Sequence, residues 1–176
     1  GLLERNTLWR MDAEVSGCDL HADFRRLPFQ VGRFTAAVFD PPYANNGGRH
    51  KEPTGVHATY NLKPGMSNHN ITQLYRQGLS EAWRVLHGGG VLYVKCQNQV
   101  ESGRMQWQRQ RVQELAEGLG FETVTEFVLV QQGAPRMRHE HQQHPRTVHS
   151  YLLVFRKPAE YPRRPVVLEG QLALEV

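Results

Sequence analysis

Four consecutive residues, Asp40, Pro41, Pro42 and Tyr43, carry groups that could act together on one substrate. Proline has no backbone N–H, so the apolar strand that precedes them is expected to end at Asp40. The proline rings restrict the backbone, so the carbonyl groups point in set directions, and the Asp40 carboxylate only accepts hydrogen bonds. Such a cluster of acceptors suits an exocyclic amino group, which offers two hydrogens. The Tyr43 ring adds a surface on which a base can stack.

The strands that would position this motif are visible as runs of apolar or β-branched residues. Five are expected, at residues 14–20, 34–40, 90–96, 121–130 and 150–156. The run "FTAAVFD" at 34–40 is continuously apolar until its last residue, which is typical of a strand buried on both faces. In open α/β sheets, ligands bind outside the carboxyl ends of the strands, which is where Asp40 would lie.

The first of two expected helices follows the strand that carries the motif. Apolar residues keep helical spacing from Ile71 to Leu86, and Asn70 is a candidate N-cap. The sequence "HGGG" at residues 87–90 is expected to end this helix, because glycine readily adopts the backbone conformation found after a helix terminus.

A second helix is expected from the spacing of apolar residues between Met105 and Leu119, and Gly120 should end it. The resulting alternation of strands and helices predicts an α/β fold with a mostly parallel sheet. The last two strands are joined by a long polar loop, so they could pair as an antiparallel hairpin.

Asp-Pro-Pro-Tyr after an apolar strand resembles the catalytic motif of the amino-methyltransferases that use S-adenosylmethionine. Three further segments resemble parts of these enzymes in the same order: "HADFRRLPF" at 21–29, "EAWRVLHGGGVLYVKC" at 81–96 and "HSYLLVFRK" at 149–157. The stretch "VKCQNQV" that begins at Val94 is similar to a small group of phage and actinobacterial DNA methylases. The resemblance covers roughly residues 15–157, which is most of the chain.

This resemblance implies a Rossmann-like class I methyltransferase fold, with a C-terminal antiparallel hairpin strand, over residues 1–157, followed by a tail at 158–176. The implied activity is methyl transfer from S-adenosylmethionine to the exocyclic N6 of adenine in double-stranded DNA, with the target base flipped out of the duplex. Aspartate at the first motif position is more typical of adenine-N6 enzymes than of cytosine-N4 enzymes. The alternatives are methylation of RNA, at adenine N6 or guanine N2, and an inactive subunit that binds nucleic acid or a partner enzyme.

The resemblance assigns catalysis to Asp40, Pro41, Pro42 and Tyr43. In the implied mechanism, the Asp40 carboxylate and the Pro41 carbonyl accept the two N–H bonds of the target amino group and aim its lone pair at the methyl group. Tyr43 would stack on the flipped base, and Asp40 would also border the cofactor. Most of the catalysis would then come from positioning and electrostatic complementarity, and no metal is required.

The implied cofactor residues are Asp19 for the ribose hydroxyls, Asp23 for the adenine amino group and Phe24 for the adenine ring. The spacing from Asp19 to Asp23 is short for this fold, in which a helix usually intervenes, so the two assignments compete. A Gly-rich turn usually precedes these residues, and "NTLW", which includes Thr7, could be its remnant. Either the chain begins inside that turn or the turn has degenerated, and degeneration would favour the inactive alternative.

Basic residues near the expected site could contact nucleic acid. The formal net charge of +4 permits such binding but does not establish it. Lys95 follows the strand next to the motif, and a solvated strand end is an equal alternative for it. A polar loop supplies further candidates for phosphate contacts, for which a merely solvated loop is the alternative: Arg136, Arg138 and Arg146. The histidines of the same loop have no standard zinc spacing, so no metal site is predicted there.

The remaining composition indicates an intracellular protein. No apolar run is long enough to span a bilayer and no signal peptide is visible, so a membrane role is not expected. Cys18 and Cys96 lie in strand-like apolar surroundings and are expected to be buried free thiols. We therefore expect a cytoplasmic protein, encoded by a bacterium or a phage. A homodimer and a partner subunit both remain open.

Overall fold

The computed structural model describes residues 8–12, 17–43, 66–130 and 147–159. Its main element is a four-stranded sheet with the order β3-β4-β8-β7. The strands are β3 (Phe34–Phe39), β4 (Leu86–Cys96), β7 (Glu122–Val130) and β8 (His149–Arg156). β3 and β4 are parallel, whereas β8 is antiparallel to both β4 and β7. Three strands therefore share one direction, and the expected parallel sheet is confirmed only in part: the sheet is mixed, because the last strand inserts between β4 and β7.

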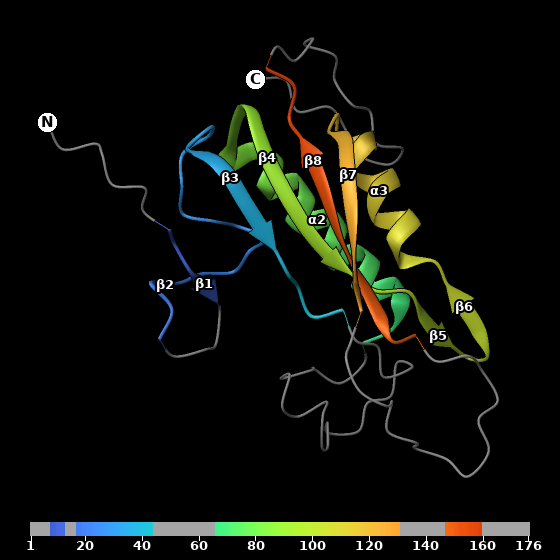
Figure 1. Ribbon diagram of the computed structural model, residues 1–176. Helices are drawn as coiled ribbons and strands as arrows, with labels where there is room; N and C mark the ends of the chain where they lie inside the picture. The colour runs from blue at the N-terminus through green and yellow to red at the C-terminus, as the bar shows by residue number, and fades with distance from the viewer. Residues whose placement is uncertain (1–7, 13–16, 44–65, 131–146, 160–176) are drawn as a thin grey trace, which may run out of the picture.

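Two helices, α2 (Asn68–Val85) and α3 (Gln108–Gly118), pack on one face of this sheet (Figure 1). Successive strand side chains point to opposite faces, so alternate residues of β4 and β8 meet the helices. The core lies between these layers and contains Ile71, Tyr75 and Leu79 from α2, Leu92, Val94 and Cys96 from β4, and Leu153 and Phe155 from β8. No helix in the described part of the chain is long and apolar enough to cross a membrane.

Four short strands complete the described elements. β1 (Met11–Asp12) pairs in parallel with β2 (Leu20–His21), and β5 (Gln99–Glu101) pairs with β6 (Arg104–Gln106) as a hairpin. The strand expected at 14–20 is thus wrong for its described end, where only Leu20 is extended. Gly17 has a φ of +89°, which interrupts an extended chain at this point.

The ends of α2 differ from the expected ones. Ser67 is the N-cap and its hydroxyl accepts a hydrogen bond from the Asn70 N–H at 3.3 Å, so Asn70 lies inside the first turn and its prediction as N-cap is wrong. The helix ends at Val85, and β4 begins at once with Leu86, so the "HGGG" stretch belongs to the strand.

The second helix starts later than its apolar spacing predicts. α3 begins at Gln108, and Met105 lies in β6, where it pairs with Val100. Its end is as predicted: Gly120 has a φ of +100°, and the Phe121 N–H returns to the Ala116 carbonyl at 3.1 Å.

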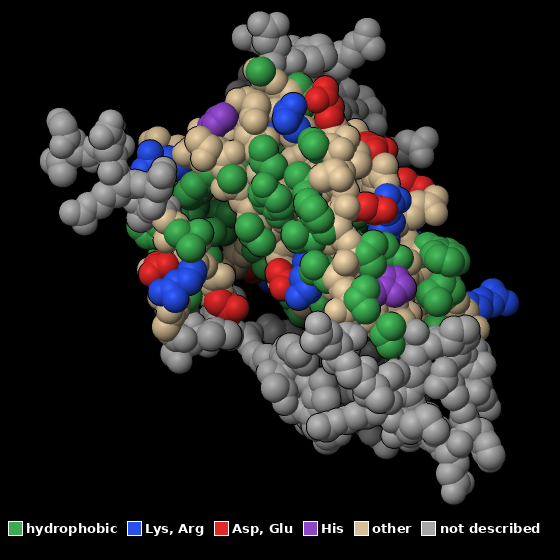
Figure 2. All heavy atoms as spheres, in the orientation of Figure 1, with side chains coloured by type: hydrophobic (Ala, Val, Ile, Leu, Met, Phe, Trp, Pro, Cys, Tyr) green, Lys and Arg blue, Asp and Glu red, His purple; other side chains and the backbone are tan. Residues whose placement is uncertain are grey.

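The face of the sheet opposite the helices is apolar and open within the described residues. The register aligns Val38 of β3 with Tyr93 of β4 and Val154 of β8, and Phe127 of β7 with Leu152. Hydrophobic side chains gather over the sheet on this face (Figure 2). β3 was expected to be buried on both faces, but it lies at one edge of the sheet and Val38 is 72% exposed. That expectation is wrong because the described helices cover only one face.

Candidate functional site

The Asp-Pro-Pro-Tyr motif lies at the carboxyl end of β3, directly beside the carboxyl end of β4. The parallel register pairs Phe39 with Val94, so the next residues, Asp40 and Lys95, also meet. The Lys95 Nζ lies 3.1 Å from an Asp40 carboxylate oxygen, and both side chains are partly exposed. The strand pairing thus forms an ion pair at the motif from residues 55 positions apart.

Lys95 also contacts the other end of the motif, since its Nζ lies 5.7 Å from the centre of the Tyr43 ring. Partial burial lowers the pKa of Lys95, but the hydrogen bond and the charge of Asp40 outweigh it, so the pKa of Lys95 is above its ordinary value. The ammonium is therefore protonated at neutral pH. Its position allows it to reach Asp40 and the aromatic face together.

The backbone around the motif is fixed from two sides. Pro41 is buried, Tyr43 is partly buried against the core, and the Gln99 side-chain amide donates a hydrogen bond to the Tyr43 carbonyl. On the β4 side, the buried Tyr75 hydroxyl donates to the Lys95 carbonyl at 2.7 Å. Burial raises the pKa of Tyr75 well above its ordinary value, so this hydroxyl keeps its proton and remains a donor.

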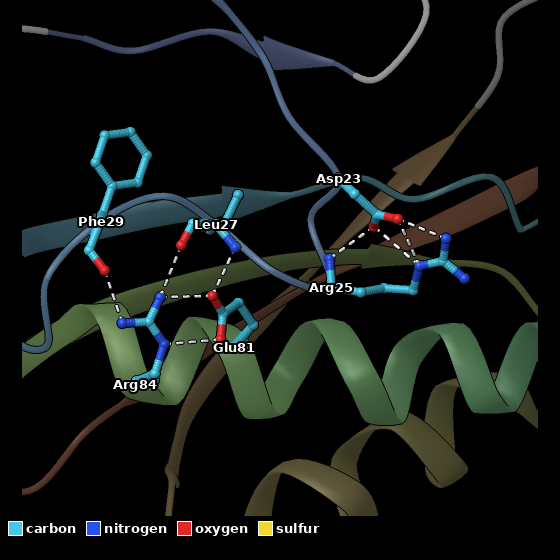
Figure 3. Close-up of polar contacts among 6 residues, drawn as sticks. All are labelled: Asp23, Arg25, Leu27, Phe29, Glu81 and Arg84. Atoms are coloured by element: carbon cyan, nitrogen blue, oxygen red, sulfur yellow. Dashed lines mark hydrogen bonds and ion pairs between the residues drawn. The ribbon is translucent and has the colours of Figure 1, made fainter.

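One of the predicted cofactor residues, Phe24, contacts the same strand end, and Asp23 precedes it in the chain. The Phe24 ring is 5.1 Å from the ring of Phe39, the residue before Asp40, and Phe39 in turn meets Tyr75 at 5.9 Å. The Asp23 carboxylate accepts hydrogen bonds from the Arg25 N–H and guanidinium at 2.9 Å, and both side chains are about half exposed (Figure 3). The Phe24 ring thus lies beside the residue that precedes the motif, and the Asp23 carboxylate is an acceptor one residue further along the loop.

The loop that carries Asp23 and Phe24 is held against α2 by Glu81 and Arg84 (Figure 3). The Leu27 N–H donates to the Glu81 carboxylate at 2.6 Å, and Arg84 donates to the carbonyls of Leu27 and Phe29 at 3.0 and 2.7 Å. Glu81 and Arg84 also pair with each other at 2.6 Å. These hydrogen bonds, between residues 54 or more positions apart, therefore fix the position of the loop relative to α2.

Asp19, the competing cofactor candidate, lies in a different environment. It pairs with Arg10, whose backbone N–H donates to the Asp19 carboxylate at 2.8 Å and whose Nε lies 3.3 Å from it. This pair braces the separate two-stranded β1–β2 unit. The contacts of Asp19 are thus with Arg10, whereas the contact with the end of β3 is made by Phe24, the neighbour of Asp23.

The other predicted contacts fall outside the described residues. These are Thr7 in the candidate remnant of the Gly-rich turn, and Arg136, Arg138 and Arg146 in the polar loop. Among the residues that are described, no group of three or more His, Cys, Asp or Glu side chains could hold a metal ion.

Sequence reasoning missed the residues that hold the motif in place. Gln99, Glu81 and Arg84 had no assigned role, because their partners lie 54 to 57 residues away in the chain. The one available signal was the row of polar side chains at residues 97–99 directly after an apolar strand, which is an unusual place for three amides in succession.

Comparison with known proteins places this geometry in a known fold. No protein-family model and no curated protein matches the chain. Among solved structures, the chain is similar to TTHA0409 of Thermus thermophilus, a candidate DNA modification methylase. The crystal structure of TTHA0409 in complex with S-adenosyl-L-methionine matches with a TM-score of 0.54 and 20% identity, over 81% of this chain and 56% of that one. A second crystal structure of TTHA0409 matches with a TM-score of 0.55 and 16% identity, over 89% and 57%.

At these identities, the likeness shows the fold. The chain has the α/β fold of this methylase and spans a little over half of its length. The expected α/β fold is confirmed, whereas the mostly parallel Rossmann-like sheet is confirmed only in part, because the described sheet is mixed.

Proposed function

We propose that this chain is an S-adenosylmethionine-dependent methyltransferase that acts on the exocyclic N6 of adenine in DNA. One observation carries the proposal: Asp40, Pro41, Pro42 and Tyr43 lie at the carboxyl end of β3, next to Phe24, in a fold shared with a protein crystallised with S-adenosylmethionine. In α/β sheets this end of the strands is where ligands bind.

The residues next to the motif fit the adenine end of this cofactor. The Asp23 carboxylate is an acceptor that can receive the adenine amino group, and the Phe24 ring can pack on the base. Arg25 occupies Asp23 in the structure, but both side chains are about half exposed, and exposed ion pairs contribute little stability. Replacing the Asp23–Arg25 ion pair by a hydrogen bond from the cofactor should therefore cost little free energy.

The protein's own groups then prepare the target amino group. Its lone pair is delocalised into the base, so the nitrogen is a poor nucleophile until its two N–H bonds are directed. The Asp40 carboxylate and the Pro41 carbonyl accept these two bonds, which favours a pyramidal nitrogen with its lone pair free. When bound, S-adenosylmethionine supplies the electrophilic methyl group. The nitrogen loses one proton as the new bond forms, and Asp40 can accept it and pass it to water.

Two further residues have roles in this proposal. Tyr43 stacks on the flipped base, because its ring lies at the end of the motif that approaches the base. Lys95 releases Asp40 when the amino group arrives and can then face the negative nucleic acid. Both partners of this ion pair are partly exposed, so water can take over their hydrogen bonds during the exchange.

The first test is a calorimetric titration of the whole chain with S-adenosylmethionine. We expect a micromolar dissociation constant that Asp23→Ala weakens about tenfold, because a charged acceptor is lost. Glu122→Ala is the control: this carboxylate lies at the start of β7, on the opposite edge of the sheet. Absence of binding by the unmodified chain would contradict the proposal and would leave the inactive, nucleic-acid-binding alternative.

The second test follows transfer of a labelled methyl group into adenine-containing DNA and RNA, with nucleoside analysis to identify the methylated atom. We expect N6-methyladenine in DNA. Asp40→Ala should abolish transfer without changing cofactor affinity more than a few fold. Lys95→Met separates the ion pair from the carboxylate: it removes the same ion pair while keeping Asp40, so it should weaken DNA binding but lower the rate of transfer far less than Asp40→Ala. Product in RNA alone, or at another atom, would refute the assignment to adenine in DNA.

A further inference from the structure

The segment that follows β4 makes hydrogen bonds to both helices, to β8 and to the motif. Its alternate side chains make three long-range hydrogen bonds: Gln97 donates to the His149 carbonyl of β8 at 2.8 Å, Gln99 donates to the Tyr43 carbonyl, and Glu101 accepts from the Asn68 N–H at the start of α2 at 3.0 Å. Between them, the Asn98 side chain accepts from the Arg109 N–H at the start of α3 at 2.9 Å. Residues 97–101 thus join both helices, β8 and the motif.

These contacts hold the backbone at Gln99 in a fixed position. Gln99 begins β5, which pairs with β6 in the hairpin from Gln99 to Gln106. Asn98 and Glu101 each satisfy a backbone N–H at a helix N-terminus, where such donors have no partner within the helix. The Asn98 side chain is buried and Glu101 is partly buried. The hairpin therefore cannot shift without breaking bonds to two helices.

Tyr43 lies at the end of the motif, directly after two prolines. The preceding prolines have no N–H, so the backbone on that side cannot be held by donated hydrogen bonds from Pro41 and Pro42. Among the contacts of Tyr43, its carbonyl accepts a hydrogen bond from Gln99, and its ring contacts the core and lies 5.7 Å from the Lys95 Nζ. The bond from Gln99 therefore acts at the residue whose ring is proposed to stack on the target.

We infer that Gln99 is a positioning residue that sets the orientation of the Tyr43 ring against the target base. This inference rests on the proposed function, in which Tyr43 stacks on a flipped base. Gln99 does not touch the base; it acts through the Tyr43 carbonyl. Its donor N–H is the required feature, because the group that it meets is an acceptor.

Two substitutions remove this donor in different ways. Gln99→Glu keeps the size but replaces the amide N–H by a carboxylate, which at neutral pH only accepts hydrogen bonds and repels the carbonyl. Gln99→Met keeps the length without any polar group, and it is available if the glutamate variant does not fold. Gln97→Glu is the matched control: it breaks the same kind of bond, from an amide to a backbone carbonyl, two residues away, but at His149.

The direct readout needs no ligand. Fluorotyrosine is incorporated at all six tyrosines, and the Tyr43 signal in the fluorine NMR spectrum is assigned with Tyr43→Phe. We expect Gln99→Glu and Gln99→Met to shift or broaden the Tyr43 signal, and Gln97→Glu to leave it in place. An unchanged Tyr43 signal in both Gln99 variants would overturn the inference, whatever the activity of the chain.

The kinetic readout is a double-mutant cycle on DNA. Gln99→Met should lower kcat/KM for DNA about tenfold while leaving the affinity for S-adenosylmethionine unchanged. In a Tyr43→Ala background the same change should have almost no further effect, because a residue that acts through Tyr43 is silent once the ring is absent. Additive losses would overturn the inference. A shifted Tyr43 signal in a chain that transfers no methyl group would support the positioning role and would refute the proposed function.

Discussion

Two sets of polar contacts near the candidate site join segments that are far apart in the sequence. Lys95 reaches Asp40 across the parallel pair of strands, and Glu81 and Arg84 of α2 bind the backbone of Leu27 and Phe29. The first set fixes the motif against β4, and the second fixes the loop that carries Asp23 and Phe24 against α2.

The hydrogen bonds and ion pair of Glu81 make the stability of the fold depend on pH. The hydrogen bond from Arg84 lowers the pKa of Glu81 below its ordinary value of 4.5, the Leu27 N–H adds to this, and together they outweigh burial. A carboxyl group whose pKa is lowered by folding stabilises the native state above its unfolded pKa, and this contribution is lost as the pH falls through the folded value. We expect the free energy of unfolding of Glu81→Gln to be lower than that of the unmodified chain at neutral pH.

The difference in unfolding free energy between Glu81→Gln and the unmodified chain should narrow as the pH falls below 4.5. Urea denaturation at a series of pH values from neutral to about pH 3 would measure it. Parallel pH profiles for the two proteins would show that Glu81 does not contribute in this way. Repeating the series with S-adenosylmethionine present would show whether Glu81→Gln reduces the stabilisation that the bound cofactor provides.

At the scale of elements, α2 approaches the end of β3 unusually closely. Gly78 faces the Phe39 ring, and a Cβ built on Gly78 would lie 2.1 Å from the ring, well inside contact distance. The same ring meets Phe24 and Tyr75. The absence of a side chain at Gly78 therefore sets the distance between the helix and the strand that carries Asp40.

We expect Gly78→Ala to destabilise the protein, although alanine favours a helix by up to about 1 kcal/mol over glycine. Without the gain in helix propensity, the clash should lower the free energy of unfolding by about 1–3 kcal/mol, because the Phe39 ring is packed on several sides and has little room to move. Chemical denaturation would measure the change.

Two further variants test this explanation. Gly118→Ala is the control, since it places the same residue in a helix where a Cβ meets nothing within 4 Å, and it should be neutral or stabilising. Phe39→Leu should relieve part of the defect in the Gly78→Ala background, because leucine is smaller. A stabilised Gly78→Ala protein would contradict the close approach.

Elements were predicted better than their ends. The strands at 34–40, 90–96, 121–130 and 150–156 and both helices are present, because their apolar patterns are long and periodic. The N-cap of α2 was missed by three residues, because Ser67 and Asn70 are both good caps and the choice depends on Glu101, which binds the Asn68 N–H. The extension of β4 through "HGGG" was missed because glycine usually interrupts strands; here the register with β3 shifts between Leu86 and Val91, and the segment is held instead by the backbone of Lys157, which bonds the Gly89 N–H at 2.8 Å and the Gly90 carbonyl at 2.9 Å.

At the scale of the whole molecule, the two faces of the sheet should respond very differently to substitution. Phe155 of β8 faces the helices and is fully buried, whereas Phe127 of the neighbouring strand faces away and is 53% exposed. We expect Phe155→Ala to cost about 3–5 kcal/mol of unfolding free energy. Phe127→Ala should cost well under half of that, because a half-exposed ring buries less area and leaves no closed cavity.

Denaturation of both variants under one set of conditions would compare the faces directly. Equal losses would show that the face around Phe127 is covered in solution. A fluorescent dye that binds apolar surface gives an independent measure: its signal should fall when Val38, which is 72% exposed, is replaced by serine.

The sequence by itself determined the local features of this protein. It predicted the end of β3 at Asp40, because two prolines cannot continue a paired strand, and the positions of the helices and main strands, because their periodicity is local. The tertiary structure alone decided that Lys95 meets Asp40, that Gln99 holds Tyr43, and that Phe24 packs on Phe39 at the end of β3. It also decided the insertion of β8 between β4 and β7, and which face of the sheet is open. These outcomes depend on contacts between residues tens of positions apart. Such contacts form only when the chain folds and the strands pair, so a local sequence pattern cannot predict them.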